Sequence, residues 1–217
     1  MDAKTIIAKR AGQEFSNGDY VNLGIGIPTL IANHLPENIK VTFHSENGFL
    51  GIGPKPAPGN EDRDIVNAGG LPVSIIPGGA TFDSAMSFAI IRGGHLNITV
   101  LGALQVDEEA NLANWIIPGK KVPGMGGAMD LVAGARRVII AMEHTAKGKP
   151  KIVPHCTLPL TATRAVHMIV TDMAVFKYLP TLTLTELAPG VTEEQVRQCT
   201  SAKYDVAADL RVMPIAE

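Results

Sequence analysis

The sequence predicts an α/β fold: a single-domain, open, mostly parallel β-sheet with helices on both faces. Short apolar segments of strand length alternate along the chain with amphipathic segments of helical periodicity, as in repeated βαβ units. The segment NITVLGAL, residues 97–104, is almost continuously apolar, which is typical of a parallel strand buried on both faces. With 217 residues, 46% of them hydrophobic, the chain can build one large core. We therefore expect one domain over residues 1–217.

Charge and cysteine content restrict the class of protein. The formal net charge of −2 is too small to attract nucleic acid or an anionic membrane, so we expect neither as a partner. No window reaches the roughly 20 apolar residues that cross a bilayer, and the N-terminus lacks the apolar core of a signal peptide. Cys156 and Cys199 form no CxxC motif and are expected to be free thiols. We expect a soluble cytoplasmic protein.

The first part of the chain is predicted to form a helix, a strand, a second helix and a second strand. Residues 3–16 carry apolar side chains at helical spacing and end at the stop signal Asn17-Gly18. A short strand, Tyr20–Leu23, runs into the turn GIGIPT and a helix that ends near His34. Val41–Ser45 forms the next strand.

A loop, a strand and a capped helix are predicted next. The prolines, glycines and mixed charges of residues 51–64 predict the loop. Residues 74–76 begin a strand that is expected to end at the turn PGGA. The helix covers SAMSFAIIRGG, with Asp83 or Ser84 as its N-cap and Gly93 as its C-terminal stop.

Strands and helices continue to alternate in the second half of the chain. The predicted segments are a strand at 97–104, a strand at Asn111–Trp115, a glycine-rich loop over PGKKVPGMGGAMD (118–130), a helix over MDLVAGA, a strand at Arg137–Met142, two apolar segments between Ala165 and Phe176 separated at Thr171-Asp172, and a half-exposed strand at Thr181–Glu186. A last helix spans Thr192–Thr200, where Thr192 is the N-cap and Gln195 completes a capping box.

Several glycine turns are expected to lie along one edge of this sheet. In open α/β sheets, ligands bind at the carboxyl ends of the strands. The turns that follow Leu23, Ser45, Ile76 and Leu104 should gather there. Glu46 lies on the same edge, where a buried strand enters a glycine-rich turn, and this placement favours a functional site over a cap.

Most nucleotide and metal motifs are incomplete or absent. The turn GIGIP has Gly24 and Gly26, but Thr29 occupies the place of a further glycine in a dinucleotide fingerprint, so we reject a Rossmann dehydrogenase. The sequence contains no P-loop, no GxSxG elbow and no HExxH. The pairs Glu143-His144 and His155-Cys156 match no standard zinc spacing, so we expect no metal.

Two motifs remain that could carry chemistry. In SENG, residues 45–48, Glu46 is flanked by small polar residues, and it is either a rigidly held base or nucleophile or a partner in an ordinary salt bridge. In GMGGAMD, Gly126 and Gly127 free the backbone for close approach to a ligand, and Ala128 opens a helix whose first amides attract negative charge. The amides of Gly127 and Ala128 are candidate oxyanion donors, with a structural glycine turn as the alternative.

Together these motifs resemble a known family. The chain is similar to the beta subunit of the family I CoA-transferases of the 3-oxoacid type, which act on acetoacetate, acetate or butyrate. The resemblance runs through nearly the whole chain, less distinctively after about Pro150, in NLGIGIPT (22–29), SENGFLGIGP (45–54), DIVNAGG (64–70), FDSAMSFAIIRGGH (82–95), LGALQVDEEANLANW (101–115), PGKKVPGMGGAMDLV (118–132) and VIIAMEH (138–144). The combination of SENG with GMGGAMDLV is specific.

The resemblance implies a mechanism and a set of site residues. Glu46 matches the family's nucleophile and would attack the acyl carbon of a CoA thioester, giving an acyl-glutamyl anhydride and then a glutamyl-CoA thioester in a ping-pong reaction. Gly126, Gly127 and Ala128 would lie on the loop that lines the thioester. The residues expected to line the same site are Ser45, Asn47, Gly48, Gly24 and Gly26. Coenzyme A or acyl-CoA would be a substrate, and no permanently bound cofactor is expected.

The resemblance also implies a partner. In this family a related alpha subunit contributes a GxGGF motif to the CoA pocket, whereas this chain has GMGGA and no GxGGF. We therefore expect the chain to be inactive alone and to pair with a CoA-transferase alpha subunit, as an alpha2-beta2 assembly. Two other hypotheses stay open: a sugar-phosphate isomerase or ligand sensor that uses Glu46 as a base, and a structural subunit without activity.

Overall fold

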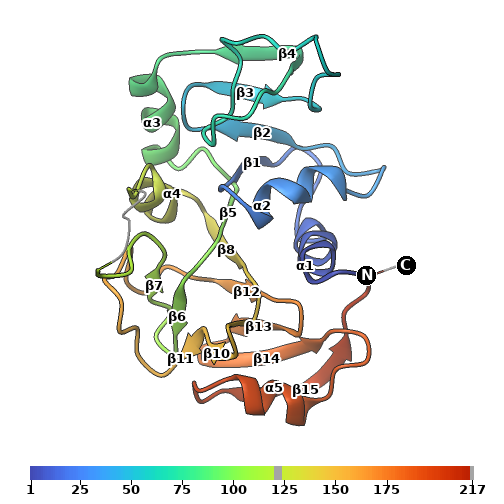
Figure 1. Ribbon diagram of the computed structural model, residues 1–217, viewed down its shortest axis with the longest axis vertical. Coiled ribbons are helices and arrows are strands. Elements are labelled where there is room, and N and C mark those ends of the chain that lie inside the picture. The colour runs from blue at the N-terminus through green and yellow to red at the C-terminus, as the bar shows by residue number, and fades with distance from the viewer. Residues whose placement is uncertain (120–123, 216–217) are drawn as a thin grey trace.

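The computed structural model describes residues 1–119 and 124–215, and within them ten strands form one sheet (Figure 1). Their order across the sheet is β15-β14-β13-β12-β8-β5-β1-β2-β3-β4. The strands are β1 Tyr20–Leu23, β2 Thr42–Ser45, β3 Phe49–Ile52, β4 Ile75–Thr81, β5 Ile98–Leu101, β8 Arg137–Ala141, β12 Met168–Val170, β13 Ala174–Tyr178, β14 Leu182–Leu187 and β15 Asp205–Val212. Residues 120–123 of the predicted glycine-rich loop lie outside the described residues.

The centre of the sheet is parallel. β12, β8, β5, β1 and β2 all run in one direction, and β15 is parallel to β14. The antiparallel pairs lie toward the two ends, where β3 and β4 follow β2, and β13 and β14 follow β12. The predicted α/β class with a mostly parallel sheet is confirmed.

Helices cover both faces of the sheet (Figure 1). They are α1 Ala3–Gly12, α2 Ile27–Leu30, the 3-10 helix η1 Ile31–Asn33, α3 Ser84–Arg92, α4 Ala128–Gly134 and α5 Glu193–Cys199. Successive side chains of a strand point to opposite faces, so β8 contributes to two separate cores. Ile139 and Ala141 pack in the core that contains α1, whereas Val138 and Ile140 pack in the core that contains α3 and α4. Among the described residues, no helix has the length and apolarity of a transmembrane span.

The order of the strands creates a crevice at the carboxyl edge. β1 pairs with β2 on one side and with β5 on the other, and β5 pairs in turn with β8. The chain therefore leaves β1 and β5 toward opposite ends of the sheet, and such a point in an open α/β sheet forms a binding crevice outside the carboxyl ends. Leu23, Ser45 and Leu101 are the last residues of the three strands that border it.

Two predictions about β3 and β4, the last two strands at this end of the sheet, are wrong. Residues 51–52, predicted to begin a loop, belong to β3, and β4 runs through PGGA instead of ending there. Gly79 permits this pairing, because a Cβ at that position would lie 2.9 Å from the Leu50 carbonyl oxygen. Pro77 is tolerated because β4 is the last strand of the sheet, where a missing N–H can face the unpaired side. The turn expected after Ile76 is therefore not part of the carboxyl edge.

The predicted caps of α3 and α5 are confirmed, whereas the first helix ends at Gly12 and not at the predicted stop Asn17-Gly18, and the small strands were missed. Asp83 caps α3 by accepting from Met86 N–H, and Thr192 forms the expected capping box with Gln195 at the start of α5. The segments that the sequence did not predict as strands are β6 Gln105–Asp107, β9 Thr145–Ala146, β10 Lys149–Pro150, β11 Ile152–Val153 and β15, while β7 Leu112–Ala113 lies within a predicted strand. These are pieces of two or three residues, except β15, which lies at the exposed end of the sheet.

A buried ion pair connects the first helix to the far end of the sheet. Arg10 in α1 is 2% exposed and donates at 2.9 Å to Oε1 of Glu186 in β14, which is 1% exposed. Arg211 in β15 donates to the same oxygen at 2.8 Å. Burial acts to raise the pKa of Glu186, but the hydrogen bonds from Arg10 and Arg211 outweigh it, so the pKa is lowered. The carboxylate is thus ionised at neutral pH and fully paired.

Candidate active site

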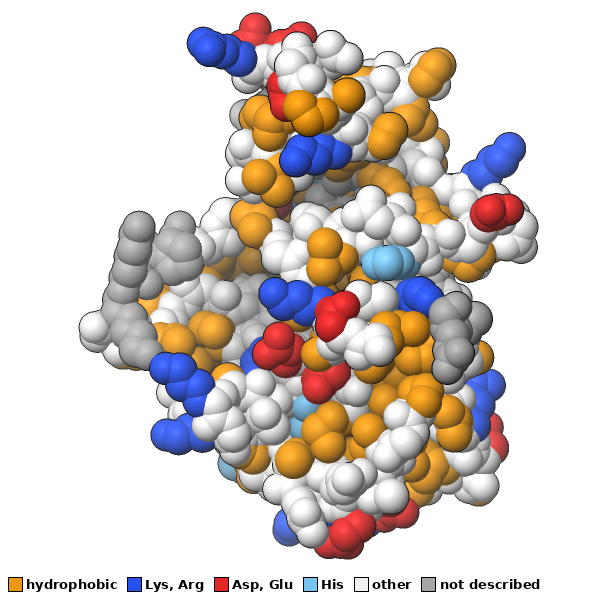
Figure 2. Space-filling view, turned by 45° about the vertical axis from the view of Figure 1, so that its right-hand side comes forward, with side chains coloured by type: hydrophobic (Ala, Val, Ile, Leu, Met, Phe, Trp, Pro, Cys, Tyr) orange, Lys and Arg blue, Asp and Glu red, His pale blue; other side chains and the backbone are white. Residues whose placement is uncertain are grey.

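A cleft with a volume of about 690 Å³ opens at the carboxyl ends of β1, β2 and β5. Its described lining includes Leu23, Ser45 and Leu104, so the turns after these three positions meet at one edge, as predicted. Figure 2 shows the surface hollowed below the part of the molecule that carries β3 and β4. Glu46 is the only charged side chain among the described residues that line the cleft. One carboxylate in a cavity of this size is a candidate nucleophile or base.

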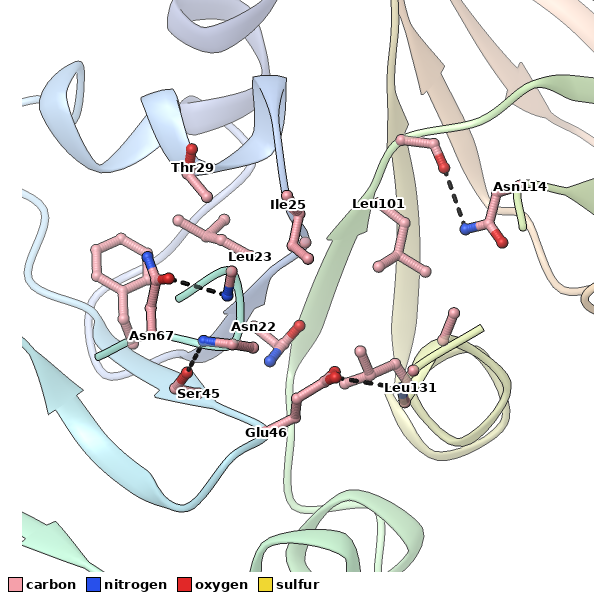
Figure 3. A pocket seen from close by; sticks show the side chains of 18 of the residues that line it. Asn22, Leu23, Ile25, Thr29, Ser45, Glu46, Asn67, Leu101, Asn114 and Leu131 are labelled. Atoms are coloured by element: carbon pink, nitrogen blue, oxygen red, sulfur yellow. Dashed lines mark hydrogen bonds between the residues drawn. The ribbon is translucent and has the colours of Figure 1, made fainter. Parts of the chain in front are cut away.

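Glu46 points from the end of β2 toward the start of α4 (Figure 3). Its Oε1 accepts a hydrogen bond from the Gly127 N–H at 3.2 Å. Both glycines of the loop are needed for this approach, since an added Cβ would lie 3.3 Å from Oε1 at Gly126 and 2.7 Å from Oε2 at Gly127. The loop that was predicted to approach a ligand therefore approaches the nucleophile candidate itself.

Ala128 lines the cleft, but its amide is directed away from Glu46. The Ala128 N–H donates to the Met125 carbonyl oxygen at 3.3 Å. Of the two amides predicted to hold an oxyanion, the Gly127 amide is the one that contacts Glu46. An oxyanion role for the Ala128 amide stays a prediction.

The polar residues on either side of Glu46 anchor its turn to a neighbouring loop. Ser45 Oγ donates to Asn47 Oδ1 at 2.6 Å and accepts from the Ala68 N–H at 3.1 Å. Asn47 Nδ2 donates to the Val66 carbonyl oxygen at 2.7 Å. These bonds hold the turn from behind, so Ser45 and Asn47 position the carboxylate and leave it facing the cleft.

Glycines at two predicted positions, Gly48 and Gly24, allow close backbone approach around the site, whereas Gly26 meets no neighbouring atom and does not line the cleft. Gly48 has a φ of 130°, and a Cβ there would lie 2.2 Å from the Phe82 carbonyl oxygen. At Gly24 a Cβ would lie 3.1 Å from the Val100 carbonyl oxygen, which accepts a hydrogen bond from the Gly24 N–H. Gly26, with a φ of 93°, precedes the first residue of α2. Gly48 therefore fixes the SENG turn, and Gly24 brings the end of β1 against β5.

A buried polar chain lies directly behind the turn and was not predicted. Asn22, His44 and Ser87 come from β1, β2 and α3, and their exposed fractions are 3%, 1% and 0%. Asn22 Nδ2 lies 3.2 Å from both His44 Nδ1 and the His44 carbonyl oxygen, and His44 Nε2 lies 3.0 Å from Ser87 Oγ. Burial lowers the pKa of His44 to about 4, so the ring is neutral at pH 7. Polar residues inside buried strands were a signal, but their pairing spans three elements.

The other walls of the cleft are mostly apolar, with one amide fixed by hydrogen bonds. Figure 3 shows Leu101 and Asn114 across the cleft from Leu23 and Ile25. Asn114 Nδ2 donates to the Gly102 carbonyl oxygen at 3.2 Å. Such walls exclude water once the opening is covered.

The cysteines and the possible metal ligands do not form a second reactive site in the described part of the chain. Cys156 and Cys199 are free thiols, as predicted. Burial raises the pKa of Cys156 to about 12, so it is not a thiolate at neutral pH. Within the described ranges, no three His, Cys, Asp or Glu side chains are placed to hold a metal ion.

Comparisons with known proteins give a consistent result. The family model described as coenzyme A transferase matches residues 4–198. The chain is 61% identical over 212 residues to the beta subunit of the acetate CoA-transferase of Escherichia coli strain K12, covering 97% of each chain. It is 51% identical over 208 residues to a subunit of the probable succinyl-CoA:3-ketoacid coenzyme A transferase of Bacillus subtilis strain 168, covering 95% of this chain and 96% of that one. An acyl-CoA transferase apoenzyme from Escherichia coli O157:H7 shares the fold, with a TM-score of 0.76 and 22% identity over 98% of this chain and 43% of that chain.

Proposed function

Because this chain belongs to the coenzyme A transferase family, we propose that it is the beta subunit of a short-chain acyl or 3-oxoacid CoA-transferase with Glu46 as the nucleophile. That the chain is a CoA-transferase subunit follows from the family match and from the two named relatives. The catalytic mechanism, the carboxylic acid substrates and the assembly with an alpha subunit are what we propose. CoA moves between an acyl-CoA and a free short-chain carboxylic acid, a class that includes the acetate and ketoacids in the relatives' names.

The observation that carries the proposal is the state of the Glu46 carboxylate. It is the one charged side chain in the described lining of the cleft, and only its Oε1 accepts a hydrogen bond from a described residue. Oε2 has no hydrogen-bond donor among the described residues. A rigid carboxylate with one oxygen held and one free is suited to attack a carbonyl carbon.

In the first half-reaction, the Glu46 carboxylate is converted into a CoA thioester. Its Oε2 attacks the acyl carbon of the thioester, the C–S bond breaks, and CoA leaves as a thiolate with the electron pair, giving an acyl-glutamyl anhydride. The thiolate then attacks Cδ of Glu46, and the acyl group leaves as a free carboxylate. The products are a glutamyl-CoA thioester on Glu46 and one carboxylic acid.

In the second half-reaction, an incoming carboxylate attacks Cδ of the glutamyl-CoA thioester and expels the thiolate, which again leaves an anhydride. The thiolate attacks the acyl carbon of that anhydride, so the new acyl-CoA departs and the Glu46 carboxylate is restored. Every nucleophile and leaving group is a carboxylate or a thiolate, and no proton is transferred. The reaction therefore needs positioning and charge stabilisation more than an acid or a base.

Gly127 supplies charge stabilisation at the steps that attack Cδ. Its N–H already points at Oε1 at 3.2 Å, and Oε1 becomes the oxyanion when the thiolate or the incoming acid adds to Cδ. One backbone donor of this kind contributes about 10²–10³ in rate. The same glycine leaves space for the carboxylate, which explains why the loop has no side chain there.

An alpha subunit is the proposed partner, in an alpha2-beta2 assembly. Two large apolar side chains are exposed close to the cleft, since Ile25 is 71% and Met129 is 52% exposed. Ile25 lines the cleft, and Met129 follows the lining residue Ala128. A partner that covers these side chains would also close the cleft against water. The word "subunit" in the names of both relatives supports such a partner.

Trapping the glutamyl-CoA thioester tests the proposal. The chain is combined with a CoA-transferase alpha subunit and incubated with acetoacetyl-CoA, and peptides are analysed by mass spectrometry before and after borohydride reduction. We expect a CoA adduct on Glu46 in the wild type and in Glu37→Gln, which removes an exposed carboxylate outside the cleft. Glu46→Gln should form no adduct and lose turnover by several orders of magnitude. An adduct on another residue, or normal turnover of Glu46→Gln, would refute the proposal.

A further inference from the structure

The buried chain of Asn22, His44 and Ser87 has no part in the reaction steps above. All three side chains are almost fully buried, and they join the ends of β1 and β2 to α3. His44 is separated from Glu46 by Ser45 alone. A polar group buried this deeply is costly unless it is hydrogen-bonded, so the arrangement of these bonds is tightly determined.

The donor and acceptor of each hydrogen bond among Asn22, His44 and Ser87 follow from the chemistry of the groups. The His44 carbonyl oxygen can only accept, so the Asn22 atom facing it at 3.2 Å is the amide nitrogen. The same nitrogen faces His44 Nδ1, which must then be the acceptor. In a neutral imidazole the proton consequently lies on Nε2 and is donated to Ser87 Oγ at 3.0 Å.

Ser87 links these hydrogen bonds to α3, which also contacts Gly127, the donor to Glu46. The next residue of α3, Phe88, packs against Gly127, since a Cβ at Gly127 would lie 3.2 Å from the Phe88 ring. α3 is tied to α4 a second time, because Arg92 Nε donates to Asp130 Oδ1 at 2.7 Å. Gly127 in turn donates to Glu46. The contacts therefore connect the residue before the SENG turn, through α3 and Gly127, to the carboxylate of Glu46.

We propose that His44 is a positioning residue that sets the distance between the Glu46 carboxylate and the Gly127 amide through its bond to Ser87. The inference rests on the proposed function, in which that distance governs attack at Cδ. If the bond to Ser87 is lost, β2 and α3 are no longer coupled, and the carboxylate and its amide donor move independently. A displacement of about 1 Å in such a site costs roughly 10²-fold in rate.

Three variants separate positioning from folding. His44→Leu keeps the bulk of the side chain and removes both hydrogen bonds, whereas His44→Gln can still accept from Asn22 and donate to Ser87. Ser87→Ala removes only the link to α3. The matched control is His144→Leu: His144 is also 1% exposed and bonded at 2.9 Å to two hydroxyls, those of Thr171 and Thr200, but it does not line the cleft.

The assay uses the complex with the alpha subunit and compares kcat, KM for acyl-CoA and the single-turnover rate of thioester formation on Glu46, each per folded complex. We expect His44→Leu to lose about 10²-fold in kcat and in the single-turnover rate with little change in KM, because binding is untouched and only transition-state positioning is lost. Ser87→Ala should lose a smaller factor, and His44→Gln should recover most of the rate. His144→Leu should lower the melting temperature without lowering kcat.

The outcomes are distinguishable from failure of the proposed function. If the wild-type complex transfers no CoA, the proposed function and this inference fall together. If the wild type is active and Ser87→Ala and His44→Leu keep its kcat, the positioning role is refuted while the function stands. Should His44→Leu fail to fold, Ser87→Ala decides: if Ser87→Ala loses no more kcat than the control His144→Leu, His44 is reduced to a structural residue.

Discussion

Replacing Gly127 by Ala tests the contact on which the proposed chemistry depends. Gly127 has a φ of −83° and a ψ of 8°, which alanine adopts without strain, so the backbone tolerates the change. The new Cβ would lie 2.7 Å from Glu46 Oε2 and 3.0 Å from Cδ. To reach an ordinary contact of 3.4 Å, the carboxylate must withdraw by about 0.7 Å, and its 3.2 Å bond to the amide lengthens with it. The Cβ would also lie 3.2 Å from the Phe88 ring, which must shift by a few tenths of an ångström, so the substitution acts mainly on the nucleophile.

The expected loss follows from two contributions. Removing one oxyanion donor costs about 10²–10³ in kcat, and displacing a reacting group by about 1 Å costs about 10². Because the two effects act on the same geometry, they overlap, and we expect kcat to fall about 10²–10³-fold with KM for acyl-CoA little changed. Steady-state assays of the reconstituted complex and the rate of thioester trapping on Glu46 measure both quantities.

The control for this substitution lies in the same cleft. At Gly102 an added Cβ would meet no atom within 4 Å, so Gly102→Ala adds a methyl group without touching Glu46. We expect its effect on kcat to be far smaller than that of Gly127→Ala. If Gly127→Ala retained kcat within a few-fold of the wild type, or if both variants lost the same factor, the contact between Gly127 and the carboxylate would not matter for catalysis.

Two further predictions concern the stability of the turn and of the buried ion pair. Gly48→Ala should lower the free energy of unfolding by more than the roughly 1–3 kcal/mol of a strained φ, because the Cβ also clashes with Phe82 at 2.2 Å; denaturant unfolding measures this, and a neutral effect contradicts it. Glu186→Gln should destabilise the protein at pH 7 by at most about 3–5 kcal/mol, since it removes one of the two carboxylates that pair with the buried Arg10 and leaves Glu14 as the other. The pKa of Glu186 is lowered by folding, so its contribution is present above its ordinary value of 4.5 and disappears as the pH falls through the lower folded value. The difference in unfolding free energy between wild type and Glu186→Gln should therefore shrink below about pH 4.5, and a difference that is constant with pH would disprove the pairing.

The parts of the site that could be predicted are those encoded within a few consecutive residues. The SENG turn combines a strand end, a carboxylate and a glycine in four positions, and the structure places it at the cleft with Gly48 in a conformation that requires glycine. The same holds for the Asp83 cap and the Thr192–Gln195 capping box, whose bonds join residues three apart. Local sequence determines such features because their partners are local.

The features that were missed or wrong depend on pairing between distant segments. PGGA has the composition of a turn, and it continues β4 only because β3 lies beside it and the other side of the strand is unpaired. The bond between His44 and Ser87 joins residues 43 positions apart in different elements. The three-dimensional approach of Gly127 to Glu46 spans 81 positions and was anticipated only as a loop near the site. Sequence patterns identified Glu46 and Gly127 but not His44 or Ser87, and the pairing of distant segments determined which residues meet.

The four residues of the SENG turn illustrate how one carboxylate is made available. Ser45 is bonded to Ala68, Asn47 to Val66, and Gly48 accepts from the Phe82 N–H at 2.8 Å, so three of the four are tied to structure behind the turn. Only the Glu46 side chain points into the cleft, where it accepts a hydrogen bond from the Gly127 amide. A nucleophile must be rigid and yet unshielded, and these demands conflict if its own side chain carries the anchoring bonds. Distributing the anchors over its neighbours resolves the conflict, which is why small polar residues and a glycine flank the acid.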